Sequence, residues 1–182
     1  MQRPPGLRGR YHQPIFPSLI ASQRDHGMAV WILKTEPADC SLDDIRDVLG
    51  GIMRWDGIRN YQARNNLRAM RKGDVCLVYH AGSRSAGIAG IATVAREAYP
   101  DPAQFDPESP GFDRAATPAK PRWLAVDLRY HGRFPRPLSV AALREQPALE
   151  ALALLRQGRL SVSPVSAEQW LVLAALLGES KP

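Results

Sequence analysis

Residues 55–68 read Trp55-Asp56-Gly57-Ile58-Arg59-Asn60-Tyr61-Gln62-Ala63-Arg64-Asn65-Asn66-Leu67-Arg68. The Asp-Gly pair is a turn signal, and after it Ala63, Leu67 and Met70 follow the i, i+4, i+7 spacing of the buried face of a helix. The stretch therefore predicts a short strand ending at Trp55, a turn, and a helix over residues 60–71. Its polar and aromatic side chains are denser than a plain scaffold needs, so it is also a candidate binding site.

Short apolar runs on both sides of this stretch predict strands. The expected strands cover residues 29–34, 52–55, 75–81, 87–95, 123–130 and 159–165. Glycines inside the run 87–95 indicate a close backbone approach. The other expected helices cover residues 41–49, 147–156 and 166–178, and Ser41 with Asp44 resembles a capping box at the start of the first. A long Pro- and Asp-rich loop is expected from Pro100 to Pro121. This α+β pattern predicts a small mixed or antiparallel β barrel flanked by helices.

The chain length of 182 residues suits one domain. We expect this domain to cover residues 28–178, with a short tail over residues 179–182. Residues 1–27 are rich in Pro, Gly and Arg and show no sustained periodicity. They predict a disordered extension, or a non-native one that arises from a start codon upstream of Met28.

The composition favours an anionic partner, because the formal net charge is +6 and the isoelectric point is about 9.7. Cys40 and Cys76 are far apart and form no Cys-x-x-Cys pair, which fits a reducing, cytoplasmic setting. No apolar run approaches the ~18 residues of a membrane-spanning helix, so no membrane partner is expected. The composition leaves the oligomeric state open.

Sequence signatures of catalysis are missing. The four histidines form no His-x-His or His-Glu-x-x-His pair, so no metal site is expected. The stretch 82–87 has the glycines of a P-loop but lacks the Lys and Ser/Thr that must follow, and no Gly-x-Ser-x-Gly elbow is present. These absences predict a protein that is not an enzyme and needs no cofactor.

A second dense stretch reads Trp31-Ile32-Leu33-Lys34-Thr35-Glu36-Pro37. Together with residues 55–68 it is similar to the signature of the EVE domain family. Further matches follow in the family order: Gly73-Asp74, Tyr79-His80, Gly87-Ile88-Ala89-Gly90, Glu97-Ala98-Tyr99-Pro100-Asp101, Gln104-Phe105, Pro121-Arg122-Trp123, Val126-Asp127, Arg159-Leu160-Ser161-Val162 and Pro164. The resemblance runs from about Ala29 to about Leu177, and residues 1–27 lie outside it.

This resemblance implies a PUA-like β barrel related to the YTH domains, which hold a methylated base in an aromatic cage. It also implies a nucleic-acid-binding module whose aromatic-lined pocket recognises a modified cytosine in DNA or a modified RNA base. The expected partner is therefore DNA or RNA that carries a modified base. Many family members have Ser after the Tyr-His pair, whereas this chain has Ala81. The change removes a hydroxyl group from the expected rim of the pocket.

The residues themselves suit this chemistry, because a base that leaves its stack needs an aromatic face and polar groups at its edge. Trp55 and Tyr61 are expected to wall the pocket, and an acid such as Glu36 can accept a hydrogen bond from an exocyclic amine. The residues expected in the base-binding pocket are Lys34, Thr35, Glu36, Trp55, Asn60, Tyr61, Asn65, Tyr79, His80 and Ser161, of which Tyr79, His80 and Ser161 rest on the resemblance. The residues expected to bind phosphate are Arg59, Arg64, Arg68, Arg71 and Lys72.

Several of these side chains have a second interpretation that the sequence leaves open. Trp55 suits a core position as well as a pocket, Asn60 suits a helix N-cap, and His80 suits a hydrogen-bonded core position. Arg64 and Arg68 also fit a solvated helix face. Two other functions stay open: an enzyme with Glu36 as acid or base and Lys34 setting its charge, and a sensor of a free nucleoside.

Overall fold

The structure is a computed structural model, and it describes residues 27–82 and 86–179. The expected N-terminal extension therefore lies outside the described residues except for Gly27, and so do residues 180–182 of the tail. The strands are β1 (Val30–Thr35), β2 (Ile52–Trp55), β3 (Val75–His80), β4 (Gly87–Pro100), β5 (Leu124–Ser139) and β6 (Val162–Val165). The helices are α2 (Leu42–Asp47), α3 (Tyr61–Ala69), α4 (Val140–Arg144), α5 (Ala153–Arg156) and α6 (Ala167–Glu179), with 3₁₀ turns at Pro102–Phe105 and Pro147–Leu149.

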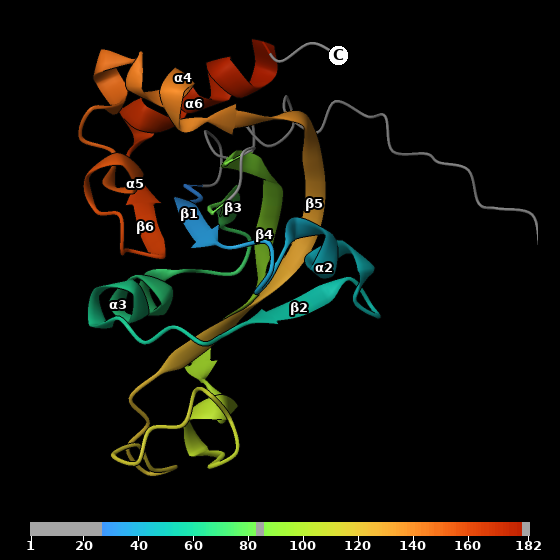
Figure 1. Cartoon of the computed structure of the whole chain (residues 1–182), viewed down its shortest axis with the longest axis vertical. Coiled ribbons are helices and arrows are strands. Elements are labelled where there is room, and N and C mark those ends of the chain that lie inside the picture. The colour runs from blue at the N-terminus through green and yellow to red at the C-terminus, as the bar shows by residue number, and fades with distance from the viewer. Residues whose placement is uncertain (1–26, 83–85, 180–182) are drawn as a thin grey trace, which may run out of the picture.

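The strands form one six-stranded sheet in the order β2-β5-β4-β3-β1-β6 (Figure 1). β1 pairs with β3 in parallel, and the other pairs are antiparallel. The α+β class with a mixed sheet is confirmed, but the sheet is not closed into the expected barrel, because β2 and β6 stay at opposite edges of the sheet. Register shifts along β4 and β5 bend the sheet without bringing its edges together.

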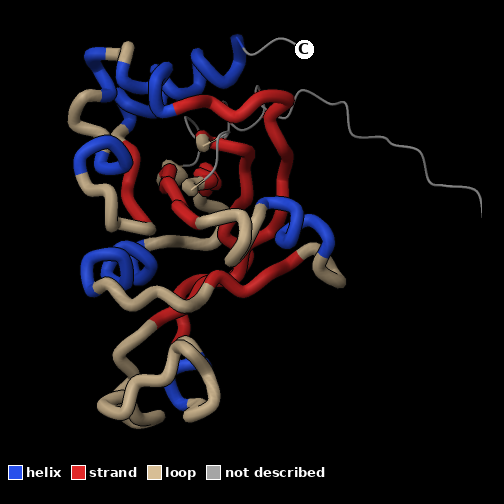
Figure 2. Tube along the Cα trace, in the orientation of Figure 1, coloured by secondary structure: helices blue, strands red, loops and turns tan. Residues whose placement is uncertain are grey.

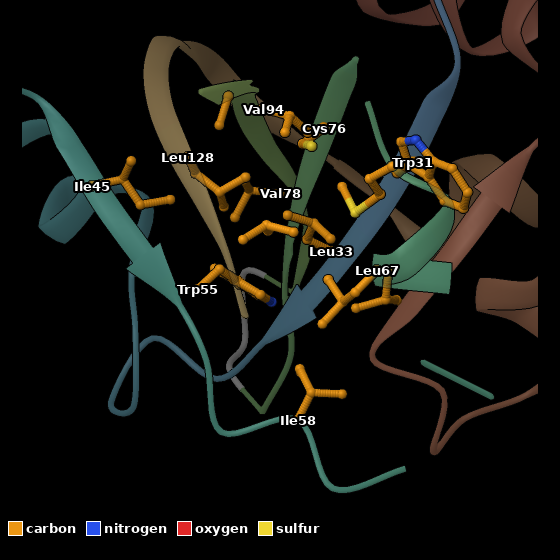
Figure 3. Packing of buried hydrophobic residues seen from close by; sticks show 14 of the residues in the cluster. Trp31, Leu33, Ile45, Trp55, Ile58, Leu67, Cys76, Val78, Val94 and Leu128 are labelled. Atoms are coloured by element: carbon orange, nitrogen blue, oxygen red, sulfur yellow. The ribbon is translucent and has the colours of Figure 1, made fainter. Parts of the chain in front are cut away.

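The paired strands β1 and β3 are buried on both faces, so alternate residues supply two separate cores. Val30 and Ile32 of β1 belong to a cluster that includes Trp170 and Leu173 of α6. Trp31 and Leu33 point to the other cluster, which contains Ile45 of α2, Leu67 of α3 and Trp55 (Figure 3). In the view of Figure 2, α4 and α6 lie together at the top, and α2 and α3 lie lower, on opposite sides of the strands.

The long pair β4–β5 requires glycine where the two backbones approach. A Cβ atom at Gly87 would lie 2.6 Å from the carbonyl oxygen of Leu138, and one at Gly90 would collide with the backbone of Gly132. The close approach expected from the glycines of this run is therefore confirmed. β5 also contains Pro135 and Pro137, which normally argue against a strand.

The prolines are tolerated because the register shifts at that point. Ile88 pairs with Leu138 and Gly90 pairs with Arg133, so residues 134–137 oppose Ala89 alone and give up few ladder bonds. This is why β5 continues past the expected end at Tyr130. The expected helix over residues 147–156 is interrupted, because the backbone is extended at Leu152.

The buried carboxylate of Asp74, which is 4% exposed, ties three segments together. Its oxygens accept hydrogen bonds from the backbone N–H of Ala29 at 3.0 Å, from the indole Nε1 of Trp31 at 2.9 Å, and from the backbone N–H of Arg71 at 2.9 Å. Asp74 thus joins the start of β1 to the end of α3.

We expect Asp74→Ala to lower the free energy of unfolding by more than ~2 kcal/mol, because a buried donor without a partner costs ~1–3 kcal/mol. Urea unfolding measures the change. Glu108→Ala is the matched control, since this residue is exposed and its carboxylate makes no hydrogen bond or ion pair within the described residues. Equal effects of the two substitutions would contradict the structural role of Asp74.

Candidate functional site

A pocket of about 490 Å³ opens where β1, β2 and the segment before β6 meet. Its volume lies in the range of small-molecule binding sites. The edge strand β2 and the segment that leads into the other edge strand, β6, both contribute to it. The lining residues are Lys34, Thr35, Glu36, Asp39, Cys40, Met53, Arg54, Trp55, Asp56, Gly57, Ile58, Ala81, Gly158, Arg159 and Ser161.

Backbone hydrogen bonds fix the end of β1 on both sides. The N–H of Lys34 donates to the carbonyl of Ser161 at 2.7 Å, and the N–H of Ala81 donates to the carbonyl of Thr35 at 2.7 Å. The Nζ of Lys34 donates to the carbonyl of Gly158 at 2.6 Å. These bonds hold Thr35 and the residue after it at the mouth of the pocket.

Trp55 is both a core residue and a wall of the pocket. Its side chain is 5% exposed and packs in the same cluster as Leu33 and Ile58. Figure 3 shows its indole nitrogen at the end of the side chain directed toward β1. That Nε1 is buried and has no hydrogen-bond partner among the described residues. An unpaired buried donor is costly, so it marks a place where a ligand acceptor would be stabilised.

Three carboxylates line the pocket beside Trp55, from Glu36, Asp39 and Asp56. The pKa of Asp56 is raised, first by burial and then by the nearby charge of Asp101. Arg54 lies 3.6 Å from Asp56 and offsets part of this effect. The pocket lining therefore combines the acceptors of three carboxylates with the cationic side chains of Lys34, Arg54 and Arg159.

The wall formed by residues 56–58 is held by the carboxylate of Asp101, the residue directly after β4. Asp101 is fully buried, and its Oδ2 accepts from the N–H of Gly57 at 3.2 Å and from Nη1 of Arg59 at 2.7 Å. Its Oδ1 accepts from the N–H of Ala103 at 2.8 Å. One buried acid thus joins the pocket wall to the loop after β4.

The structure brings only part of the predicted base-binding set into the pocket. Lys34, Thr35, Glu36, Trp55 and Ser161 line it, and their contact with a base stays a prediction. Ala81, where the sequence departs from the family pattern, also lies in the lining.

The other predicted residues lie outside this lining, each for a local reason. Asn60 caps α3 by accepting from the N–H of Ala63 at 2.9 Å. Tyr79 is buried in the core cluster that faces α6. The Nε2 of His80 accepts from the N–H of Leu42 at 3.0 Å. Asn65 is exposed and accepts from Arg64.

Tyr61 also lies outside the pocket, because its ring turns away to stack on Trp123, with the ring centroids 4.9 Å apart. The two aromatic residues expected to wall the pocket are therefore separated. Trp55 remains in the wall, and Tyr61 is half exposed on the neighbouring surface.

The predicted phosphate-binding cations differ in how much of their charge is available. Arg59 donates to the carbonyls of Ile58 and Gly111 and to Asp101, so its guanidinium is used inside the protein. Arg64 donates to the carbonyl of Arg122 and to Asn65. Arg68, Arg71 and Lys72 are exposed on and after α3, although Arg71 lies 4.0 Å from Glu97.

The sequence interpretation missed several lining residues, chiefly Met53, Asp56, Ile58 and Arg159. Asp56 was assigned to a turn, and the turn itself is the pocket wall. The side chain of Arg159 makes no ion pair or hydrogen bond within residues 27–82 and 86–179. The one available signal was that Arg159 and Ser161 fall in the same matched segment of the family pattern.

The family model described as EVE domain matches residues 29–176. This chain belongs to the EVE domain family. Thymocyte nuclear protein 1 from Gallus gallus is 34% identical over 169 residues, covering 84% of this chain and 69% of the relative. The Homo sapiens protein of that name is 32% identical over 157 residues, covering 77% of this chain and 70% of the relative.

Solved structures agree with this EVE fold. A Pseudomonas putida crystal structure has a TM-score of 0.77 and 47% identity, covering 82% of this chain and 99% of that one. Human THYN1 in complex with 5-methylcytosine-containing DNA has a TM-score of 0.79 and 31% identity, covering 85% of this chain and 99% of that one.

Two negative findings apply to the described residues of this EVE domain. None of its helices combines the length and apolar character needed to cross a membrane. No cluster of three or more His, Cys, Asp or Glu side chains in the described part could hold a metal ion.

The bond from Leu42 to His80 makes a pH-dependent contribution to stability. It satisfies one of the free donors of the first turn of α2, and it requires His80 to be neutral at Nε2. The pKa of His80 is lowered, first by burial and then by Arg133, against an opposing effect of Asp43 and Asp44. The unfolded chain therefore takes up a proton before the folded one. The stabilisation is complete above the unfolded pKa of about 6.5 and is lost as the pH falls toward the lower folded pKa.

We expect the free energy of unfolding of the parent to fall between pH 7 and pH 5.5, and to fall less in His80→Gln, which keeps an acceptor but does not titrate. Urea unfolding at each pH measures this. Burial also lowers the pKa of His131. His131→Gln should therefore remove the pH dependence of stability that His131 contributes and leave the part that His80 contributes. The same pH dependence in the parent and in His80→Gln would contradict the prediction.

Proposed function

We propose that this EVE domain binds a modified nucleobase of DNA or RNA in the pocket beside Trp55. The observation that carries the proposal is that Trp55 lines a pocket together with three acids, while its buried indole Nε1 has no hydrogen-bond partner among the described residues. The structural relative THYN1, solved with 5-methylcytosine-containing DNA, supports the same class of ligand.

The pocket offers complementary groups for the edge of a base. The Nε1 of Trp55 donates, and the carboxylates of Glu36 and Asp56 accept. A cytosine presents an amine that an acid can accept from, and it also has a ring carbonyl that can accept from an indole. A base reaches these groups only after leaving its stack, which makes single-stranded or flipped nucleotides the ligands.

The nucleic-acid backbone would follow the cationic rim of the pocket. Arg159 is exposed and lines the pocket. Arg68, Arg71 and Lys72 are the more distant candidates on and after α3. Because Arg grips phosphate bidentately, the position of Arg159 favours contact with the phosphate of the bound nucleotide.

We propose a binding protein rather than an enzyme that uses Glu36 and Lys34. The Nζ of Lys34 is bonded to the carbonyl of Gly158. The thiol of Cys40, which also lines the pocket, has its pKa raised to about 11, first by burial and then by nearby acids. It is therefore protonated at neutral pH and is a poor nucleophile. The expected cytoplasmic setting stays a prediction.

We expect Trp55→Phe to weaken binding of an oligonucleotide with a modified base by about tenfold, since a buried acceptor on the base would lose its donor, at a cost of ~1–3 kcal/mol. Isothermal titration calorimetry measures the affinity. Trp170→Phe is the matched control, because the Nε1 of Trp170 is also buried without a partner within the described part of the chain, but in the opposite core. A folded Trp55→Phe variant that binds as tightly as the parent would move the ligand to another site.

We expect Arg159→Ala to lower the slope of log K against log salt by about one unit, as one lost phosphate contact predicts. Arg156→Ala is the control, since Arg156 lies nearby on α5 but pairs with Glu150 at 2.6 Å. Fluorescence anisotropy across a salt series gives the slopes. Affinity that does not depend on salt in the parent would favour a sensor of free nucleosides.

A further inference from the structure

An exposed aromatic ring lies next to the pocket but does not belong to it. Tyr61 is the first residue of α3, and 49% of its surface is exposed. Its ring stacks on Trp123, with the ring planes 30° apart. Trp123 is 6% exposed and its Nε1 donates to Asp113 at 2.7 Å. The support behind Tyr61 is therefore buried and fixed, while Tyr61 itself faces solvent.

Two guanidinium groups accompany this ring. The Cζ of Arg64 lies over the Tyr61 ring, 4.8 Å from its centroid, and that of Arg122 lies 5.8 Å away. Arg122 also donates to the hydroxyl of Tyr61. Its charge is partly balanced by Asp113 at 3.1 Å, whereas Arg64 has no ion pair among the described residues. We call Tyr61, Arg64, Arg122 and Trp123 the aromatic–arginine stack.

The aromatic–arginine stack is not needed to hold the loop after β4 in place. The loop after β4 is already fastened by Asp101 and by Gln104, whose side chain bonds to the backbone of Arg122 and Trp123. An exposed aromatic ring beside guanidinium groups is the combination that stacks an unpaired base and holds its phosphate.

The stack is close enough to the pocket to contact the same strand. Tyr61 follows the lining residue Ile58 by three positions, so the two Cα atoms are at most about 11 Å apart. Stacked nucleotides rise about 3.4 Å each along a strand, so a nucleotide within about three positions of the recognised base reaches Tyr61. Asp101 contacts both Gly57 and Arg59 and so holds the chain between the pocket wall and the start of α3.

We propose that the aromatic–arginine stack is a second nucleotide site, which binds an unpaired base flanking the one in the pocket. The flanking base stacks on the exposed part of Tyr61 and Arg64, and its phosphate contacts Arg122. The site rests on the proposed function for the identity of its partner. It makes the ligand a short single-stranded segment rather than an isolated nucleoside.

The test compares three ligands: the modified nucleoside, a single-stranded heptanucleotide with that base at its centre, and the same heptanucleotide with abasic sites at the flanking positions. Tyr61→Leu keeps an apolar contact with Trp123 but removes the aromatic face, and Tyr61→Phe keeps the face without the hydroxyl. Gln62→Ala is the matched control, because Gln62 is the exposed neighbour on α3. Calorimetry gives the affinities, and thermal unfolding confirms that each variant folds.

Tyr61→Leu is expected to weaken binding of the heptanucleotide about tenfold and to leave nucleoside binding unchanged. The affinities of Tyr61→Phe and Gln62→Ala for the heptanucleotide should stay within about twofold of the affinity of the parent. Abasic flanks should weaken parent binding to a similar extent and have little further effect in Tyr61→Leu. The inference is overturned if abasic flanks do not affect the parent, if Tyr61→Leu binds the heptanucleotide normally, or if it loses nucleoside binding equally.

Failure of the proposed function gives a different result. If the parent binds modified and unmodified heptanucleotides alike and Tyr61→Leu weakens both, the second site stands and modified-base recognition does not. If the parent binds no heptanucleotide, both are overturned.

Discussion

The buried carboxylate of Asp101 is the contact on which the functional surface depends. It lies directly after β4, yet it accepts hydrogen bonds from Gly57 in the pocket wall and from Arg59 before α3. A buried acid is tolerated only when its charge is paired and its oxygens are hydrogen-bonded, and Arg59 with the N–H groups of Gly57 and Ala103 meets both conditions. Pocket wall, loop and aromatic–arginine stack are therefore parts of one rigid unit.

Trp55 shows how stability and binding are coupled in such a unit. Its ring contributes to the core that contains Leu33 and Leu67, so most of its surface stabilises the fold. Its Nε1, by contrast, lowers stability in the free protein because it is buried without a partner among the described residues. A local violation of hydrogen-bond pairing in an otherwise consistent core is expected at a binding site. A ligand acceptor there would recover the energy that the free protein gives up.

Local features were predictable from the sequence, and long-range ones were not. The capping box of Ser41 and Asp44 and the buried face of Ala63 and Leu67 depend on residues within one or two turns, and the structure contains both. Barrel closure depends on whether two four-residue edge strands meet, which no local pattern encodes. The direction of Tyr61 is set by Trp123, and the engagement of Arg59 by Asp101, both distant along the chain. The family resemblance brought the right segments together but did not say which side chains of each segment face the pocket.

The distribution of charge around the pocket suits the proposed separation between reading a base and binding a backbone. The carboxylates of Glu36, Asp39 and Asp56 line the pocket and can accept hydrogen bonds from base amines. Three cations line it as well. The Nζ of Lys34 is bonded to the carbonyl of Gly158 and Arg54 lies 3.6 Å from Asp56, whereas the side chain of Arg159 makes no ion pair among the described residues. Under the proposed function, a nucleotide would therefore place its base against the acids and its phosphate on Arg159, so that selectivity and salt-dependent affinity would depend on different residues.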